Sequence, residues 1–101
     1  MRLSNLGVMA NEALKYFMGD VYAADIGFGF LVTDRRDDDA EPTINETTAR
    51  TIVAAADGDP NAKLSPVSLF EISRDEFELY KDTEVEVPDL PKGITVWQVK
   101  R

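Results

Sequence analysis

Neither cysteine nor histidine occurs in the 101 residues of this chain. A fold without these residues has no disulfides and no zinc centre of the usual kind, so its stability must come from an apolar core. A chain of this length buries roughly 60–70% of its unfolded surface on folding, which suffices for one such core. The sequence therefore predicts a single domain over residues 1–101.

The missing residue types also restrict the chemistry. There is no imidazole to act as a general base near neutral pH and no thiol to act as a nucleophile. The serines, at positions 4, 65, 68 and 73, do not lie in a G-x-S-x-G turn. Paired carboxylates remain, but their polar sequence contexts favour ordinary pKa values. We therefore expect no enzymatic activity, no catalytic residues and no cofactor.

One segment has a partial metal-binding pattern. Asp57, Asp59 and Asn61 place oxygen ligands at the first, third and fifth positions, as in an EF-hand loop. The sixth position is Ala62 instead of glycine, and the twelfth is Ser68 instead of glutamate. The alternative is a helix terminator followed by an Asp/Pro/Asn turn, and we expect no metal site.

The first third of the chain predicts a helix followed by a long strand. Apolar residues recur at three- and four-residue steps up to Met18, with Ser4 or Asn5 as the cap and Gly19 as the terminator. Alternation then predicts one long strand over residues 22–32, one face of which is lined by Tyr22, Ala24, Ile26, Phe28, Phe30 and Val32. The glycines at 27 and 29 leave its opposite face bare.

The rest of the chain predicts shorter elements. Residues 34–42 form an acidic loop, which we expect to be mobile, and residues 44–56 form a helix between a Thr43/Glu46 capping box and Gly58. The threonines at 47, 48 and 51 favour strand instead, which would turn the fold toward all-β. A strand over 67–72 follows the loop 57–66. A helix capped by Ser73 and Glu76 runs to Lys81, with Phe77 and Tyr80 inward.

Two further strands are predicted, over 83–87 and 94–99, with Glu84 and Glu86 pointing outward from the first of them. Pro88, Pro91 and Gly93 mark the turn between the two strands. The resulting order predicts a small α+β domain, with about three helices packed on one face of a mainly antiparallel four-stranded sheet.

A short segment bears on nucleic-acid binding. Gly27-Phe28-Gly29-Phe30-Leu31 resembles the aromatic strand of RNA-recognition motifs and cold-shock domains, which commonly has the sequence K-G-F-G-F. The resemblance covers about ten residues and implies that Phe28 and Phe30 stack on bases of single-stranded nucleic acid. Ile26 stands in the place of the lysine, and no second aromatic strand follows. The alternative is that both rings belong to the core.

The charge of the chain favours another kind of partner. Nineteen acidic and eleven basic residues give a net charge of −8, so nucleic acid and anionic membranes are disfavoured. We expect the chain to be an inhibitor or adaptor that binds a basic, nucleic-acid-binding surface of a partner protein. It is similar in size and charge to phage anti-CRISPR and anti-restriction proteins. The expected contact residues are Asp37, Asp38, Asp39, Glu41, Asp75, Glu76, Glu78, Asp82, Glu84 and Glu86.

Two alternatives stay open. The acidic residues could serve solubility alone, or the chain could be an assembly subunit, such as a phage virion component, that pairs through a C-terminal edge strand bearing Trp97. The sequence does not fix the oligomeric state. The longest apolar stretch, residues 26–32, is far below the roughly 20 residues that span a bilayer. We expect a cytoplasmic protein, and a phage-encoded protein acting in the host cytoplasm fits the same features.

Overall fold

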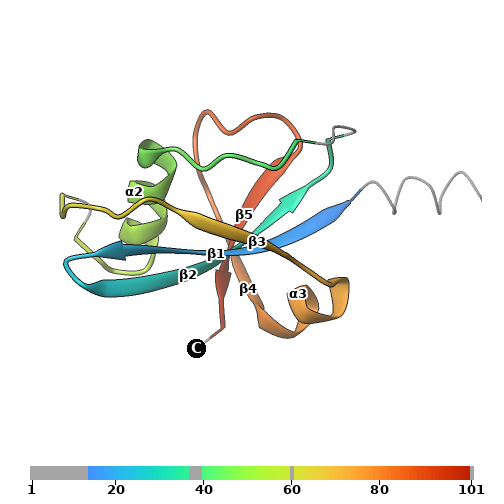
Figure 1. Ribbon diagram of the computed structural model, residues 1–101, viewed down its shortest axis with the longest axis horizontal. Coiled ribbons are helices and arrows are strands. Elements are labelled where there is room, and N and C mark those ends of the chain that lie inside the picture. Colours follow the sequence, from blue (N-terminus) through green and yellow to red (C-terminus); the bar gives the residue numbers. More distant parts are fainter. Residues whose placement is uncertain (1–13, 37–39, 60, 101) are drawn as a thin grey trace, which may run out of the picture.

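Five antiparallel strands form one sheet in the order β3-β1-β2-β5-β4 in the computed structural model, which describes residues 14–36, 40–59 and 61–100 (Figure 1). The strands are β1 (Lys15–Ala23), β2 (Ile26–Asp34), β3 (Ser68–Ile72), β4 (Lys81–Val85) and β5 (Ile94–Val99). Two helices, α2 (Glu46–Ala55) and α3 (Arg74–Tyr80), complete the described part. The α+β class and the antiparallel sheet are confirmed, whereas four strands and three helices are wrong for the described residues.

The first strand, β1, replaces the end of the predicted N-terminal helix, whose earlier part lies outside the described residues. Phe17, Val21 and Ala23 are buried and alternate with Met18 and Tyr22, which lie on the opposite face. The helical spacing of Phe17 and Met18 was therefore misleading, because the same stretch also alternates with period two and pairs along its whole length with β2.

A two-residue turn at Ala24 and Asp25 divides the predicted long strand into the end of β1 and the start of β2. Both residues have positive φ, 52° and 66°, as a type I′ hairpin turn requires. Alanine is not a usual residue of this turn and no glycine follows Asp25 directly, so no Asn-Gly or Asp-Gly turn pattern marks the hairpin. The alternative that Phe30 belongs to the core is confirmed, whereas Ile26, expected on the same face of one long strand, is exposed next to the turn.

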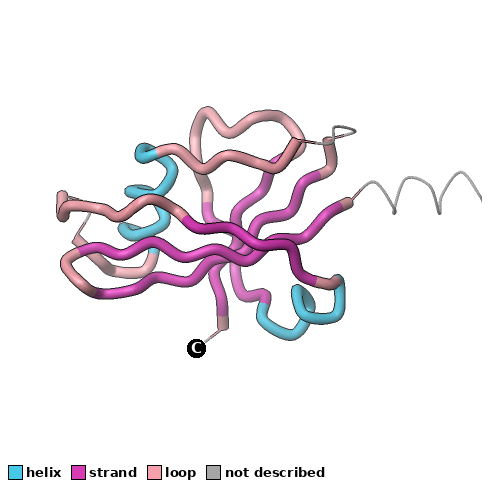
Figure 2. The backbone as a smooth tube through the Cα atoms, in the orientation of Figure 1, coloured by secondary structure: helices cyan, strands magenta, loops and turns pink. Residues whose placement is uncertain are grey.

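The two helices lie on opposite faces of the sheet, so the prediction that they share one face is wrong (Figure 2). On the α2 side, Ile52 and Val53 pack with Phe30 and Val32 in the larger cluster of buried residues. On the α3 side, Phe77 packs with Leu31 and Ile72. This second cluster is smaller, and its neighbours are only partly buried: Tyr16, Met18, Trp97 and Val99.

The predicted helix over 44–56 is confirmed as α2, but both of its termini differ from expectation. Asn45, instead of Thr43, is the N-cap, and its side chain accepts a hydrogen bond of 2.9 Å from the Thr48 amide. Asp57, instead of Gly58, has the left-handed conformation at the C-terminus, with φ of 63°. The Gly58 amide donates to the Val53 carbonyl at 2.8 Å, which completes a Schellman motif.

The C-terminal half follows the sequence prediction more closely. The capping box of α3 is confirmed: the Glu76 amide donates to Ser73 Oγ at 3.1 Å, and the Ser73 amide donates to Glu76 Oε1 at 3.0 Å. Phe77 is buried as expected, but Tyr80 remains 38% exposed. The predicted bounds of β5 are confirmed, whereas β4 begins two residues early and ends at Val85.

The strand β5 lies between β2 and β4, so the prediction of a C-terminal edge strand is wrong. The edges of the sheet are β3 and β4. Within the described ranges, neither helix has the length and apolar character needed to cross a membrane.

Candidate interaction surface

Six of the predicted contact residues lie on one continuous segment that comprises α3, β4 and the residue that follows β4. All six side chains are exposed. We call them the acidic surface: Asp75, Glu76, Glu78, Asp82, Glu84 and Glu86. The last of these lies beyond the end of β4, so it does not share a strand with Glu84 as expected.

Most residues of the acidic surface lie on a helix and a strand whose positions are fixed by contacts with the rest of the sheet. Phe77 anchors α3 to the sheet, and β4 is hydrogen-bonded to β5, where Glu84 lies opposite Trp97. The Glu76 carboxylate accepts the capping hydrogen bond from Ser73, and Lys81 Nζ lies 3.5 Å from Glu78 Oε2. The other four carboxylates form no ion pair with any residue in the described part of the chain. Within the described ranges, their charges are therefore not neutralised by a paired side chain.

The remaining predicted contact residues do not join this group. Glu41 is exposed on the loop that leads into α2, and α2 packs on the opposite face of the sheet from α3. Asp37, Asp38 and Asp39 lie outside the described residues.

Asp34, which the sequence assigned to the acidic loop, is a fully buried residue at the end of β2. Arg36 donates to it three times: from the backbone amide at 2.8 Å, from Nε at 3.1 Å and from Nη2 at 3.2 Å. Burial alone raises the pKa of Asp34, but the hydrogen bonds and the positive charge of Arg36, with a further contribution from Lys15, hold that pKa below its ordinary value. Asp34 therefore fixes the start of the loop and is not a surface carboxylate.

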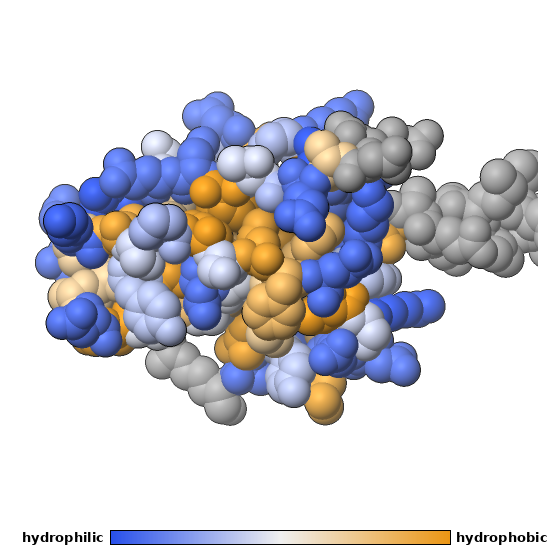
Figure 3. Space-filling view, viewed as in Figure 1, coloured by the Kyte–Doolittle hydropathy of each residue, from blue (hydrophilic) through white to orange (hydrophobic). Residues whose placement is uncertain are grey.

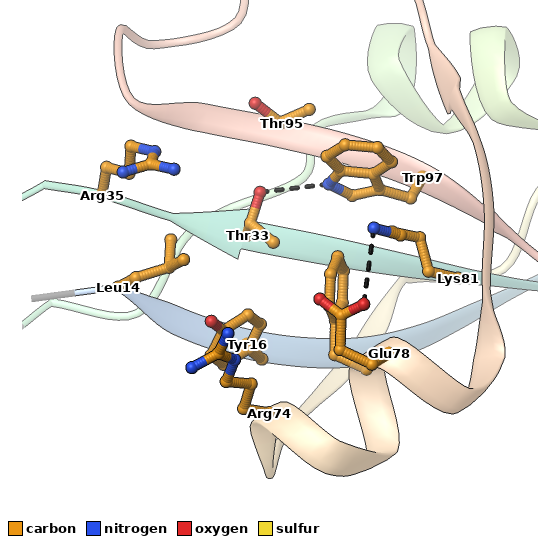
Figure 4. Close-up of a pocket in the computed structure, with 10 residues that line it drawn as sticks. Leu14, Tyr16, Thr33, Arg35, Arg74, Glu78, Lys81, Thr95 and Trp97 are labelled. Carbon is orange, nitrogen blue, oxygen red and sulfur yellow. Dashed lines mark hydrogen bonds and ion pairs between the residues drawn. The ribbon is translucent and has the colours of Figure 1, made fainter. Parts of the chain in front are cut away.

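An aromatic groove of about 710 Å³ lies beside the acidic surface (Figure 4). The Tyr16 and Phe77 ring centroids are 4.9 Å apart, and the Phe77 and Trp97 centroids are 5.7 Å apart with the rings nearly perpendicular. Trp97 Nε1 donates to Thr33 Oγ1 at 3.1 Å. The groove thus has an aromatic wall whose indole N–H is already satisfied.

Basic side chains surround this groove. Lys81 Nζ lies 5.6 Å from the Phe77 centroid and 5.5 Å from the Trp97 centroid, within the range of cation–π contacts. Arg35 and Arg74 also line the groove, toward its Leu14 end in Figure 4, whereas Lys81 and Glu78 lie toward the other end. The sequence did not indicate this site, because its residues come from β1, β2, α3, β4 and β5, and no local pattern connects them.

The aromatic residues of the cold-shock-like segment do not lie on this groove. Phe30 is fully buried among the residues that contact α2, and Phe28 packs partly buried against the same cluster. The Phe30 ring cannot stack on a base unless the core opens, which argues against the stacking role that the resemblance implied. The bare face of β2 is instead partly covered at Gly27, against which the Tyr22 ring lies.

The segment with the EF-hand-like pattern has structural roles. Asp57 ends α2, and Asp59 Oδ1 accepts a hydrogen bond of 2.9 Å from the Asn61 amide. Such a hydrogen bond is typical of an Asx turn. The described ranges contain no group of three or more carboxylates arranged to hold a metal ion.

Comparisons with known protein families, with curated proteins and with solved structures give no significant match to this chain.

Proposed function

We propose that this chain acts without catalysis by binding a partner protein, and that the acidic surface docks on a basic surface of that partner. The observation that carries the proposal is the exposure of six carboxylates along α3–β4, of which four form no ion pair with a described residue. A basic surface that binds nucleic acid is a complementary target, because it is built to receive closely spaced negative charges. The chain would then inhibit nucleic-acid binding by occupying that surface.

The local charge supports this proposal. Residues 71–89 contain eight acidic and only two basic side chains. Carboxylates on a helix and a paired strand lose less conformational freedom on binding than carboxylates on an unstructured tail. Long-range attraction between opposite charges would speed association and would weaken as salt is added.

A variant in which three carboxylates of the acidic surface are replaced by neutral amides tests the proposal. In Asp75→Asn/Asp82→Asn/Glu84→Gln, three carboxylates are removed, while Glu76 is kept for the helix cap and Glu78 for its ion pair with Lys81. We expect the wild-type chain to capture a partner from lysate at about 0.1 M salt, to lose it at about 0.5 M, and to release it to double-stranded DNA. The variant should capture at least about tenfold less of the same partner.

A matched control separates the acidic surface from total charge. Asp20→Asn/Asp25→Asn/Asp57→Asn also removes three negative charges, from β1, the hairpin turn and the C-terminal end of α2, none of which is an expected contact residue. This control should capture the partner as the wild-type chain does. Equal loss in both triple variants, or capture that is insensitive to salt, would contradict docking through the acidic surface.

Assembly through the sheet edge is a second candidate, because β3 is an edge strand with an exposed aromatic residue. Phe70 is 55% exposed on β3, and among the described strands only β1 pairs with β3. Figure 3 shows apolar side chains gathered across the middle of the viewed face, surrounded by hydrophilic ones. Light scattering tests this candidate: a defined oligomer that Phe70→Lys converts to a monomer would support it, and a wild-type monomer at about 100 μM would exclude it.

A further inference from the structure

The charges around the aromatic groove are opposite to what the whole chain would suggest. Three basic side chains and one acidic side chain line the groove, although acids outnumber bases by nineteen to eleven in the chain. Lys81 is paired with Glu78. The guanidinium groups of Arg35 and Arg74 line the groove as well and form no ion pair with any residue in the described ranges.

The wall of the groove offers two partly buried aromatic rings, Tyr16 and Trp97, to a ligand, and the buried Phe77 ring contacts both of them. Tyr16, Phe77 and Trp97 come from two strands and a helix, and their mutual contacts fix the ring orientations. The hydrogen bond to Thr33 satisfies the only N–H of the indole, so a ring that packs against Trp97 does not bury an unpaired donor. The volume of about 710 Å³ is within the range of small-molecule sites, roughly 300–1,000 Å³.

We propose that the aromatic groove binds a small planar aromatic anion, whose ring packs against the Tyr16–Phe77–Trp97 wall and whose carboxylate or phosphate is held by Arg35 and Arg74. Guanidinium groups suit this role because they are always positively charged. Their planar array of N–H donors also matches the oxygen atoms of a carboxylate or a phosphate. The proposal does not rest on docking through the acidic surface. It would hold even if the chain had no protein partner.

Two smaller pockets do not offer this combination. One, of about 460 Å³, lies between the β2–β5 end of the sheet and the C-terminus of α2, with Lys100 and Asp57 in its lining. The other, of about 260 Å³, contains Glu46 and no basic residue. Of these three pockets, the aromatic groove is the one that joins several aromatic rings to two guanidinium groups without an ion pair to a described residue.

Titration with defined probes, followed by 1H–15N NMR, tests the proposal. The indole N–H is a specific reporter because the chain contains one tryptophan, Trp97. We expect saturable shifts of this signal with 2-naphthoate, adenosine monophosphate or both. The two probes distinguish a carboxylate from a phosphate. The neutral 2-naphthamide and the ringless anions acetate and inorganic phosphate should bind at least about tenfold more weakly than the better aromatic anion.

Variants of exposed basic residues provide the second part of the binding test. Arg35→Gln and Arg74→Gln should each weaken binding of the better probe by about tenfold, since each removes a charge-assisted donor. Lys63→Gln, which removes an exposed positive charge outside the groove, should leave binding unchanged. The proposal is overturned if no probe gives a saturable shift at about 5 mM, if 2-naphthamide binds as tightly as 2-naphthoate, or if both arginine variants bind as the wild type does.

Discussion

Asp34 shows how strongly one side chain can depend on its neighbours at the residue scale. It is a buried carboxylate that accepts hydrogen bonds from the backbone and the guanidinium group of Arg36. Asp34→Asn keeps the size of the side chain but removes its charge and one acceptor oxygen. We expect it to lower the free energy of unfolding at pH 7 by about 1.5–3 kcal/mol, measured by urea denaturation.

The same residue predicts a pH dependence. The pKa of Asp34 in the folded state lies below its unfolded value of 3.8, so the ionised carboxylate stabilises the fold above that pH. This contribution is lost as the pH falls through the folded-state pKa. The stability difference between wild type and Asp34→Asn should therefore shrink below about pH 4. A difference that stays constant from neutral pH to about pH 2 would contradict this assignment, and the exposed control Asp82→Asn should cost less than about 0.5 kcal/mol.

The hairpin turn offers a residue-scale test of backbone strain. Ala24 has a φ of 52°, a conformation in which asparagine is more stable than alanine. Ala24→Asn should raise the free energy of unfolding by about 0.5 kcal/mol in thermal or urea denaturation. The same substitution at the exposed helical residue Ala54 should lower it by a similar amount, because asparagine is a poorer helix former. Changes of the same sign at both positions would exclude a left-handed turn at Ala24.

At the scale of the element, two strand glycines lie in contrasting environments. A Cβ atom on Gly19 in β1 would lie 2.5 Å from Leu69 Cδ2 and 2.6 Å from Phe30 Cζ, and Phe30 is fully buried. A Cβ atom on Gly29 in β2 would meet Val99 Cγ2 at an ordinary 3.8 Å. Gly19→Ala should therefore destabilise the protein by about 1–3 kcal/mol.

Gly29→Ala is the matched control, and it should be neutral or stabilising by up to about 1 kcal/mol because it limits the unfolded backbone. Chemical denaturation of both variants measures the two effects. If both substitutions destabilised the protein equally, the replacement of a strand glycine, and not the clash with Phe30 and Leu69, would account for the lower free energy of unfolding.

Elements with one dominant local signal could be predicted from the sequence, and the others could not. The Ser73–Glu76 capping box located α3 correctly, and the turn residues up to Gly93 located the start of β5 at Ile94. The stretch that became β1 contained helical and strand periodicities together, and only pairing with β2 and β3 decided between them. The turn at Ala24–Asp25 was missed because pairing of the two adjacent strands imposes on Ala24 a left-handed conformation that alanine does not favour.

At the scale of the whole molecule, local sequence patterns predicted one part of the candidate site and not the other. Exposure of the carboxylates in 71–89 was predictable, because charged side chains between sparse apolar residues rarely become buried. The aromatic groove was not, since Tyr16, Phe77 and Trp97 meet only through the strand order β1-β2-β5 and the packing of α3 over it. Sheet order is set by contacts that no local window contains.

The unequal cores on the two sides of the sheet predict unequal local stability. The α2 side has an extensive cluster around Phe30, Val32 and Val53, whereas α3 places a single buried residue, Phe77, against the sheet. Leu79 of α3 is 64% exposed. Opening α3 therefore exposes little apolar surface, so it should require less free energy than unfolding the sheet.

Native-state hydrogen exchange measures this difference. Amides of α3 should exchange through a local opening at least about 2 kcal/mol below global unfolding, while amides of β1 and β2 should exchange only globally. Phe77→Leu should weaken protection in α3 more than in β2, because it removes part of the one buried contact of the helix while the α2-side cluster stays intact. If α3 amides were as protected as those of β2 in the wild type, the sheet and both helices would form one cooperative unit. The acidic surface and the aromatic groove would then be as rigid as the core itself.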